Sequence, residues 1–314
     1  MSSPLTLSDD EAANQAARPQ RLALLAIIAG AIGIAFAPIF VRLSDVGPVA
    51  SAVWRVGLAT PLLFLLAAIS HKRRARHTDP GPPPFQAFFI QGSALGLGFC
   101  GLSFAADLGF WHYSIEFTTV ANSTLLANLA PIFVALAAWL LFKDPPNRGL
   151  VMGLALAMIG CVILMFTSLE LGNRNLIGDV LGIATAMAYA AYQLSVAKLS
   201  RRFDPLTIMA WSSLITTPIL VLLAVILGEQ IWPSSGFGWG AVIALAVISH
   251  AGGQTCIAYG FAHLNSTFAS TSLLLQPVVA ALLAWVIFGE ALGPLHIIGG
   301  LVVLTGIYLA RRAS

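Results

Sequence analysis

The feature that most constrains this chain is a succession of ten apolar segments, each about twenty residues long and separated from the next by a short polar turn. A helix needs roughly 20 apolar residues to cross a bilayer, and lipid offers its backbone groups no other partner. Only 9% of the residues are charged, against about a quarter in soluble domains. The sequence therefore predicts an all-α polytopic membrane protein. The ten predicted spans are about 22–43, 48–70, 88–113, 117–142, 149–168, 177–199, 205–228, 238–261, 265–288 and 294–311.

The basic residues are distributed unevenly over the loops. Short cytoplasmic loops retain Lys and Arg, so the side that carries more of them faces the cytoplasm. With the N-terminus inside, thirteen of the sixteen basic residues fall on the inner side, whereas Arg174 falls outside and Arg42 and Arg55 fall within spans. The sequence predicts a plasma-membrane protein with both termini cytoplasmic. In a bacterium this membrane would be the inner membrane. The thirteen inner residues are Arg18, Arg21, Lys72, Arg73, Arg74, Arg76, Lys143, Arg148, Lys198, Arg201, Arg202, Arg311 and Arg312.

The first twenty residues are polar and contain the acidic run Asp9-Asp10-Glu11. A cleaved signal peptide begins with basic residues, so we interpret residues 1–20 as a disordered cytoplasmic tail before a retained first helix. The net charge of +3 does not indicate a nucleic-acid partner, because the basic residues are scattered among short loops. Cys100, Cys161 and Cys256 lie in apolar runs without metal-ligand spacing, so neither a metal nor another cofactor is predicted.

The two halves of the chain repeat each other. Trp54 recurs as Trp211, and Thr60-Pro61 recurs as Thr217-Pro218, both 157 positions later. Further matches have an offset of 146, and the extra loop at 71–84 can absorb the difference of 11 residues. The matches at the second offset pair Pro131, Trp139, Phe142, Asp144, Gly153 and Gly160 with Pro277, Trp285, Phe288, Glu290, Gly299 and Gly306 in the same order.

Each half contains five spans, and because five is odd the second half enters the membrane upside down relative to the first. We therefore predict two inverted five-helix repeats, at residues 21–168 and 177–312. Inverted repeats build many secondary transporters, in which the substrate site lies near the middle of the bilayer between the repeats. The alternative is that a duplication only enlarged a helical bundle.

One pattern occurs in both halves: a fourth span with a central proline, an acidic residue at its end, and then a glycine-rich fifth span. The copies read Ala130-Pro131-Ile132-Phe133 through Lys143-Asp144 and Gln276-Pro277-Val278 through Gly289-Glu290, and the first half adds Phe40-Val41-Arg42 and Trp54-Arg55 after a Gly47-Pro48 turn. With these motifs the chain resembles the drug/metabolite transporter superfamily, EamA type. The resemblance implies ten helices, internal termini, and export or exchange of small metabolites such as amino acids. The first copy departs from the usual Gly-Glu where Lys143-Asp144 stands.

Arg55 and Asp107 are the charged residues predicted deepest in the membrane. A charge at the bilayer centre costs on the order of 3 kcal/mol, so such residues face a cavity or a partner. Counting from Pro48 and Glu116, they lie roughly 10 and 13 Å below the outer surface. Two interpretations are open. They form a structural ion pair, or Arg55 binds a substrate carboxylate while Asp107 binds a proton or a substrate amine.

Further candidate contacts share helix faces with these charges or with each other. Trp111 follows Asp107 by four residues, so the two lie on the same helix face. Trp111 is either a gate, an apolar contact for the substrate or an interfacial anchor. His250 and Gln254 share a face of the eighth span, and the 146 offset places Gly253 opposite Asp107. His250 either takes part in proton coupling or is a neutral histidine bonded to a neighbouring helix. Tyr189 and Gln193 are four apart in the sixth span.

Paired prolines in corresponding spans point to a transporter's site or hinges. The pairs are Pro61 with Pro218 and Pro131 with Pro277, and we interpret all four as hinges. Asn128, one turn before Pro131, and Gln276, directly before Pro277, are predicted contacts for a substrate.

Three function classes fit a chain of this kind. A secondary transporter moving a small zwitterion by alternating access is favoured, with protons as the candidate coupling ion, because the polar residues are few and central. A passive channel or facilitator usually needs a continuous polar lining. An intramembrane enzyme needs a nucleophile with a base, or a metal cluster, and no such grouping occurs in the sequence. The expected partners are a small-molecule substrate and the lipid bilayer, and either a monomer or a homodimer is compatible with the sequence.

Overall fold

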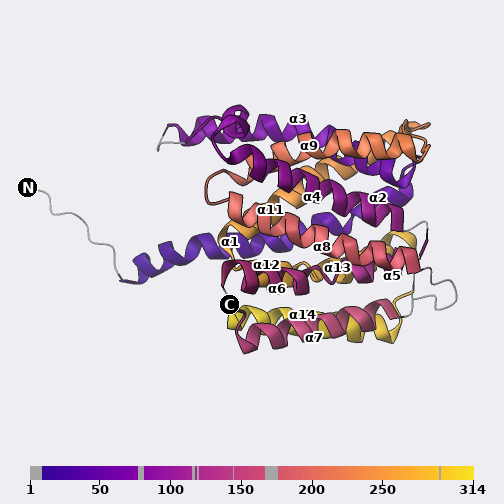
Figure 1. Cartoon of the computed structure of the whole chain (residues 1–314). Helices are drawn as coiled ribbons and strands as arrows, with labels where there is room; N and C mark the ends of the chain where they lie inside the picture. Colours follow the sequence, from indigo (N-terminus) through magenta and orange to yellow (C-terminus); the bar gives the residue numbers. More distant parts are fainter. Residues whose placement is uncertain are drawn as a thin grey trace, which may run out of the picture.

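Figure 1 shows the computed structural model of the chain as a bundle of long helices that run nearly parallel to one another. The structure describes residues 9–76, 81–114, 117–118, 120–143, 145–166, 176–289 and 291–314. Four residues used in the predictions, Glu116, Asp144, Arg174 and Glu290, lie outside these ranges.

All described regular structure is helical. The first repeat contains α1 (Asp9–Ala35), α2 (Ala37–Leu43), α3 (Pro48–Arg74), the 3₁₀ helix η1 (Pro84–Phe89), α4 (Ser93–Ser114), α5 (Val120–Ala127), α6 (Ala130–Phe142) and α7 (Arg148–Met165). The second contains α8 (Leu176–Leu199), α9 (Pro205–Ile226), α10 (Gly236–Ala244), the π-helical η3 (Leu245–Gln254), α11 (Thr255–His263), α12 (Ser266–Ser272), α13 (Leu275–Phe288) and α14 (Pro294–Ala313).

Consecutive elements join into ten helical stretches that are long and apolar enough to cross a membrane, which confirms the predicted fold class. Differences from the predicted boundaries include the starts of α4 and α1. The third span begins at Ser93 instead of residue 88, because Gly92 adopts a positive φ of 78° and separates it from η1. Helix α1 begins at Asp9, inside the segment expected to be a disordered tail. Acidic residues in a first turn favour a helix start, a signal that the prediction did not use.

Helix ends follow the local sequence. Asn147 and Asp204 cap α7 and α9 by accepting hydrogen bonds from the amides of Leu150 and Leu206. At the other ends, Lys143 after α6 and Gly289 after α13 both adopt the left-handed conformation, with φ of 55° and 69°. These two positions correspond at the repeat offset, so the departure from the family motif at Lys143 places a side chain where glycine is favoured.

The packing follows the inverted symmetry of the sequence. Helix α3 packs on its own counterpart α9, and α7 packs on its counterpart α14, at opposite sides of the bundle in Figure 1. The contact of α1 with η3 and α11 is matched by that of α8 with α4. The most extensive helix pairs all join one repeat to the other, so the repeats are interleaved and do not stand side by side.

Glycines allow the closest of these approaches. A methyl group on Gly153 in α7 would lie 2.7 Å from the carbonyl oxygen of Gly306 in α14, and one on Gly160 would lie 2.8 Å from that of Gly299. These are the glycines matched by the 146 offset. Small residues of this kind let helix backbones approach in lipid, where burial of apolar surface does not drive association.

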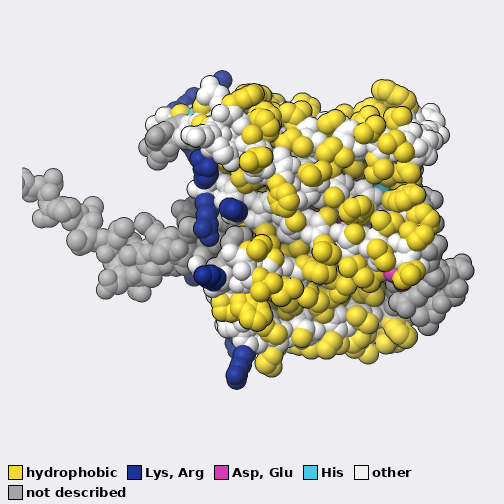
Figure 2. All heavy atoms as spheres, in the orientation of Figure 1, with side chains coloured by type: hydrophobic (Ala, Val, Ile, Leu, Met, Phe, Trp, Pro, Cys, Tyr) yellow, Lys and Arg dark blue, Asp and Glu magenta, His cyan; other side chains and the backbone are white. Residues whose placement is uncertain are grey.

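The surface divides into an apolar belt and two polar ends (Figure 2). Apolar side chains cover the middle, as expected for a protein surrounded by lipid. Basic side chains gather at one end, on the left in Figure 2, which we call the basic end. By the order of the helices, the helix ends and loops on this side include Arg21, Lys72, Arg73, Arg74, Lys143, Arg148, Lys198, Arg201, Arg202, Arg311 and Arg312.

The opposite end is held together by contacts between the repeats. The Glu229 carboxylate accepts hydrogen bonds from the amides of Val49 (3.2 Å) and Ala50 (2.7 Å), and so caps the N-terminus of α3. Asp45 accepts hydrogen bonds from the amide and hydroxyl of Ser234 at 3.1 and 2.7 Å. These bonds lower the pKa of Asp45 below its ordinary value of 3.8.

Candidate functional site

The middle of the bundle contains a cavity of about 150 Å³ between the two repeats. Both halves contribute to its lining, through α1 to α5 in the first and α8, η3 and α13 in the second. Seven of the nine predicted binding residues line it: Arg55, Asp107, Trp111, Asn128, Tyr189, Gln254 and Gln276.

Arg55 of α3 and Asp107 of α4 both face this cavity. Only 8% of Arg55 and 9% of Asp107 is exposed. Among the described residues no ion pair or hydrogen bond joins the two, and Arg55 Nε has no hydrogen-bond partner. Withdrawing two charges from water costs several kcal/mol each, and direct pairing is the usual compensation. Here a bound ligand can provide the compensation instead, with a negative group beside Arg55 and a positive group beside Asp107.

Three side-chain amides add donors to the same cavity. The amide nitrogens of Asn128 and Gln276 are buried and have no hydrogen-bond partner, whereas the Gln254 amide lies beside the hydroxyl groups of Tyr189 and Tyr192. Buried polar groups are paired in nine cases of ten or more, so two unpaired amides around one cavity are unusual. The lining thus offers a cation, an anion and three neutral donors, with the aromatic rings of Phe104, Trp111 and Tyr189 beside them.

Helix breaks bring these groups to the cavity. Helix α5 ends at Ala127 and α6 begins at Ala130, while α12 ends at Ser272 and α13 begins at Leu275. Pro131 and Pro277 lie in the first turn after each break, where the missing amide hydrogen is not needed. Pro61 and Pro218 instead lie inside the continuous helices α3 and α9.

A third break was missed by the sequence analysis. Helix α1 ends at Ala35 and α2 begins at Ala37, with Pro38 in its first turn. Pro38 lines the cavity together with Pro277, from the opposite repeat. A proline inside the first apolar run is a usable signal for this break. The second half has no proline at the matching position, so Pro38 does not appear among the paired prolines.

Two predicted binding residues lie outside the lining. His250 accepts from or donates to the Ser213 hydroxyl at 2.8 Å, and its ring stacks on Phe104 at 5.5 Å between centroids. Bonding to the neighbouring helix α9 was the alternative considered for it. Gln193 is 1% exposed, and its amide lies beside the hydroxyl group of Tyr189. Both residues belong to a buried layer just beyond the cavity.

The cavity continues toward the end opposite the basic end. A hollow of about 660 Å³ shares part of its lining, including Pro38, Trp111 and Pro277, and extends to Pro48 and His296. Trp111 therefore lies at the junction of the two spaces. Arg42, near the outer part of the hollow, lies with its guanidinium 4.4 Å from the centroid of the Phe288 ring.

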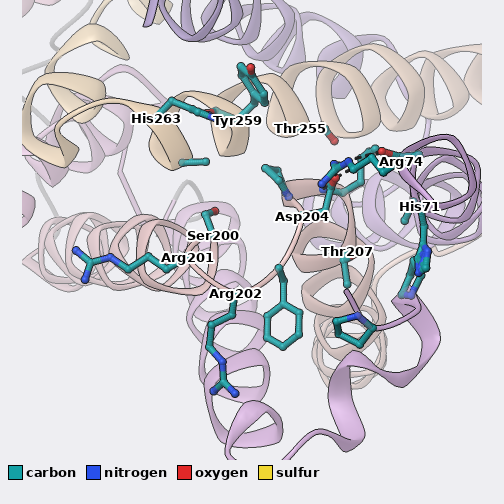
Figure 3. Close-up of a pocket in the computed structure, with 18 residues that line it drawn as sticks. His71, Arg74, Ser200, Arg201, Arg202, Asp204, Thr207, Thr255, Tyr259 and His263 are labelled. Atoms are coloured by element: carbon teal, nitrogen blue, oxygen red, sulfur yellow. Dashed lines mark hydrogen bonds and ion pairs between the residues drawn. The ribbon is translucent and has the colours of Figure 1, made fainter. Parts of the chain in front are cut away.

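The basic end has a separate vestibule of about 720 Å³, drawn in Figure 3. It shares no lining residue with the central cavity, although Thr255 on its wall directly follows Gln254. The layer between the two includes Phe104, whose ring stacks on Tyr192 at 4.5 Å, and the Tyr192 hydroxyl contacts the Met209 sulfur at 3.0 Å. The described part of the chain thus has its central cavity open toward one end and closed toward the other.

A polytopic helical membrane protein with a polar cavity between inverted repeats has the architecture of a membrane transporter. The chain belongs to the EamA-like transporter family, whose model matches residues 21–166 and 176–312. It is 26% identical over 284 residues to an uncharacterized transporter of Archaeoglobus fulgidus, covering 86% of this chain and 91% of the relative. It is 25% identical over 212 residues to the pseudopaline exporter of Pseudomonas aeruginosa, covering 67% and 73%.

The fold is also found among solved structures. A crystal structure with 17% sequence identity superimposes with a TM-score of 0.76, covering 94% of this chain and 98% of the other. Together these findings place the protein in the drug/metabolite transporter superfamily, EamA type, as an integral membrane transporter of small molecules.

Proposed function

We propose that this protein is a secondary transporter that moves a small, amino-acid-like zwitterion across the membrane by alternating access, in the direction of efflux or as an exchanger. The observation that carries the proposal is that two opposite charges, Arg55 and Asp107, line one cavity without an ion pair between them. A zwitterion presents a carboxylate and an ammonium group a few ångströms apart, and so complements both charges at once. The Pseudomonas aeruginosa relative is an exporter, which supports the efflux direction.

The residues have distinct roles in this proposal. Arg55 binds the carboxylate, while Asp107 binds the ammonium group or a coupling proton. The amides of Asn128, Gln254 and Gln276 donate hydrogen bonds to the bound solute, Trp111 and Tyr189 contact its apolar part, and His250 and Gln193 support the closed layer beneath it.

Orientation and motion complete the mechanism. We assign the basic end to the cytoplasm, with both termini there and the protein in a plasma membrane, because Lys and Arg are retained on that side. The cavity then faces outward. Repeats 21–168 and 177–312 would exchange conformations to open the other side, with hinges at Pro61, Pro131, Pro218 and Pro277.

Counterflow in liposomes tests the proposal. Vesicles loaded with an unlabelled amino acid should take up the labelled solute transiently above its equilibrium level, which a carrier produces and a passive channel does not. We expect Asp107→Asn and Arg55→Gln to reduce this uptake at least about tenfold, whereas Asp45→Asn, the same chemical change outside the cavity, should retain it.

Substrate analogues that lack one charged group distinguish the roles of Arg55 and Asp107. A solute that lacks the carboxylate should lose less affinity in Arg55→Gln than the intact zwitterion does, and one that lacks the amine should behave likewise in Asp107→Asn. Uptake without counterflow would support the alternative, a passive facilitator. Normal counterflow in both cavity variants would overturn the assigned site.

A further inference from the structure

Besides the central cavity, its outer hollow and the vestibule, the bundle has a groove that opens sideways on its apolar belt. It has a volume of about 980 Å³ and is lined by α4, α6 and α8. Helix α8 packs against both α4 and α6 and forms its floor, where Ala190 and Leu194 are buried. The small residues Ala137 and Ala191 leave space that larger side chains would fill.

The walls of this groove are apolar and face outward. Leu95 is 84% exposed and Leu140 is 65% exposed, so both extend into the surroundings of the bundle. In a protein that spans a membrane, these surroundings are lipid acyl chains. An acyl chain is therefore the group that lies against such walls, and the open question is which headgroup it carries.

Charge answers that question. Lys198 and Arg202 line the groove at the basic end, both exposed, and none of the other described residues that line it is charged. Arg202 also lines the vestibule, together with Arg201, and in Figure 3 the Arg201 and Arg202 side chains point in different directions. Two cations at one end of an apolar groove complement a lipid with a negatively charged headgroup.

The dimensions agree with a single leaflet. From Met187, at the inner end of the groove, to Lys198 helix α8 rises roughly 16 Å at 1.5 Å per residue. Half of a hydrocarbon core of about 30 Å has nearly the same thickness. A lipid with its phosphate at Lys198 would reach the middle of the membrane along α8.

We propose that this groove is a binding site for an anionic phospholipid, with one acyl chain along α8 between α4 and α6 and the phosphate on Lys198 and Arg202. The site lies in the leaflet at the basic end, which is the cytoplasmic leaflet if the orientation proposed above holds. Binding itself does not depend on the proposed transport, because the groove shares no residue with the central cavity.

Native mass spectrometry of the full chain tests this with phosphatidylglycerol and phosphatidylcholine as probes. Each cation near a membrane surface contributes about a factor of five to anionic-lipid binding, so Lys198→Gln/Arg202→Gln should bind phosphatidylglycerol about thirty-fold more weakly. The matched control is Arg148→Gln/Arg201→Gln, which removes the same charge at the same end but outside the groove, and it should bind like the wild type.

Two further variants keep the test independent of misfolding. Lys198→Arg/Arg202→Lys preserves both charges and should retain binding, while Ala137→Phe fills the groove with both charges in place and should reduce it. Equal affinity of the wild type for the two lipids, unchanged binding in the Lys198/Arg202 variant, or an equal loss in the control would each overturn the proposal.

Discussion

Arg55 and Asp107 line one cavity from neighbouring helices, yet no hydrogen bond or ion pair joins them. Removing one partner of a buried ion pair destabilises a protein by about 3–5 kcal/mol, because the remaining charge is left uncompensated. Here no such pair is broken. The consequences of removing either charge should therefore appear in transport and not in folding.

We predict that Asp107→Asn changes the free energy of unfolding by less than about 1 kcal/mol while counterflow is lost. Equilibrium unfolding in mixed micelles, followed by circular dichroism, measures the first quantity. A loss of 3 kcal/mol or more would identify Asp107 as a structural partner and contradict the site proposed here.

The contact between α7 and α14 should be sensitive to a single methyl group. In Gly153→Ala the added carbon would lie 2.5 Å from the Ala310 amide nitrogen, so the helices must separate. We expect a loss of about 1–3 kcal/mol in unfolding free energy. Gly98→Ala is the control, since nothing lies within 4 Å of its added carbon, and it should be neutral or stabilising.

Lys143 offers a test of the repeat in the opposite direction. Its left-handed conformation costs roughly 1–2 kcal/mol in a residue with a side chain. Glycine avoids this cost, but it loses more conformational entropy on folding, and this loss offsets part of the gain. Lys143→Gly should raise the free energy of unfolding by about 0.5–1 kcal/mol. The reciprocal change at the corresponding position, Gly289→Lys, should lower it, and two shifts of the same sign would refute the argument.

Glu229 should stabilise the start of α3. Glu229→Ala removes the acceptor for two amide groups at a helix N-terminus, and loss of a cap of this kind costs about 0.5–2 kcal/mol. Glu229→Gln keeps an acceptor but removes the charge that favours this position, so an intermediate loss is expected. Thermal unfolding should rank the wild type as the most stable, Glu229→Gln as intermediate and Glu229→Ala as the least stable.

The Asp45–Ser234 contact predicts a pH dependence. Hydrogen bonds from Ser234 lower the pKa of Asp45 in the folded state, so the contribution to stability is present above the ordinary value of 3.8 and is lost as the pH falls through the lowered pKa. Ser234→Ala should unfold more easily than the wild type at pH 6. The difference should shrink below pH ~3.8, and a difference that grows on acidification would contradict this assignment.

The sequence predicted the ten spans, the inverted repeat and most of the cavity, because hydropathy and repeat register both depend on regular helices. His250 shows where that regularity ends. Leu245–Gln254 is π-helical, a local winding that the sequence pattern did not indicate. Gln254 lines the cavity, whereas His250, four residues earlier, lies one turn away behind Phe104.

The spacing of residues along a helix also does not show how deep in the bundle a side chain lies. Tyr189 and Gln193 do share a face of α8, but one turn of helix separates the cavity lining from the closed layer beneath it. Pro38 was missed for a different reason, since it breaks a span that has no broken counterpart in the second repeat. Such asymmetries depend on tertiary packing.

The interleaving of the repeats has a consequence for synthesis. Helix α4 packs on α8, and α7 packs on α14, which follows it by more than a hundred residues in the chain. At about 5–20 residues per second, α7 would wait on the order of ten seconds in the membrane before its partner exists. During that interval the glycine face of α7 has only lipid or other proteins to contact, so the biogenesis of this transporter depends on how long an unfinished half can remain unpaired.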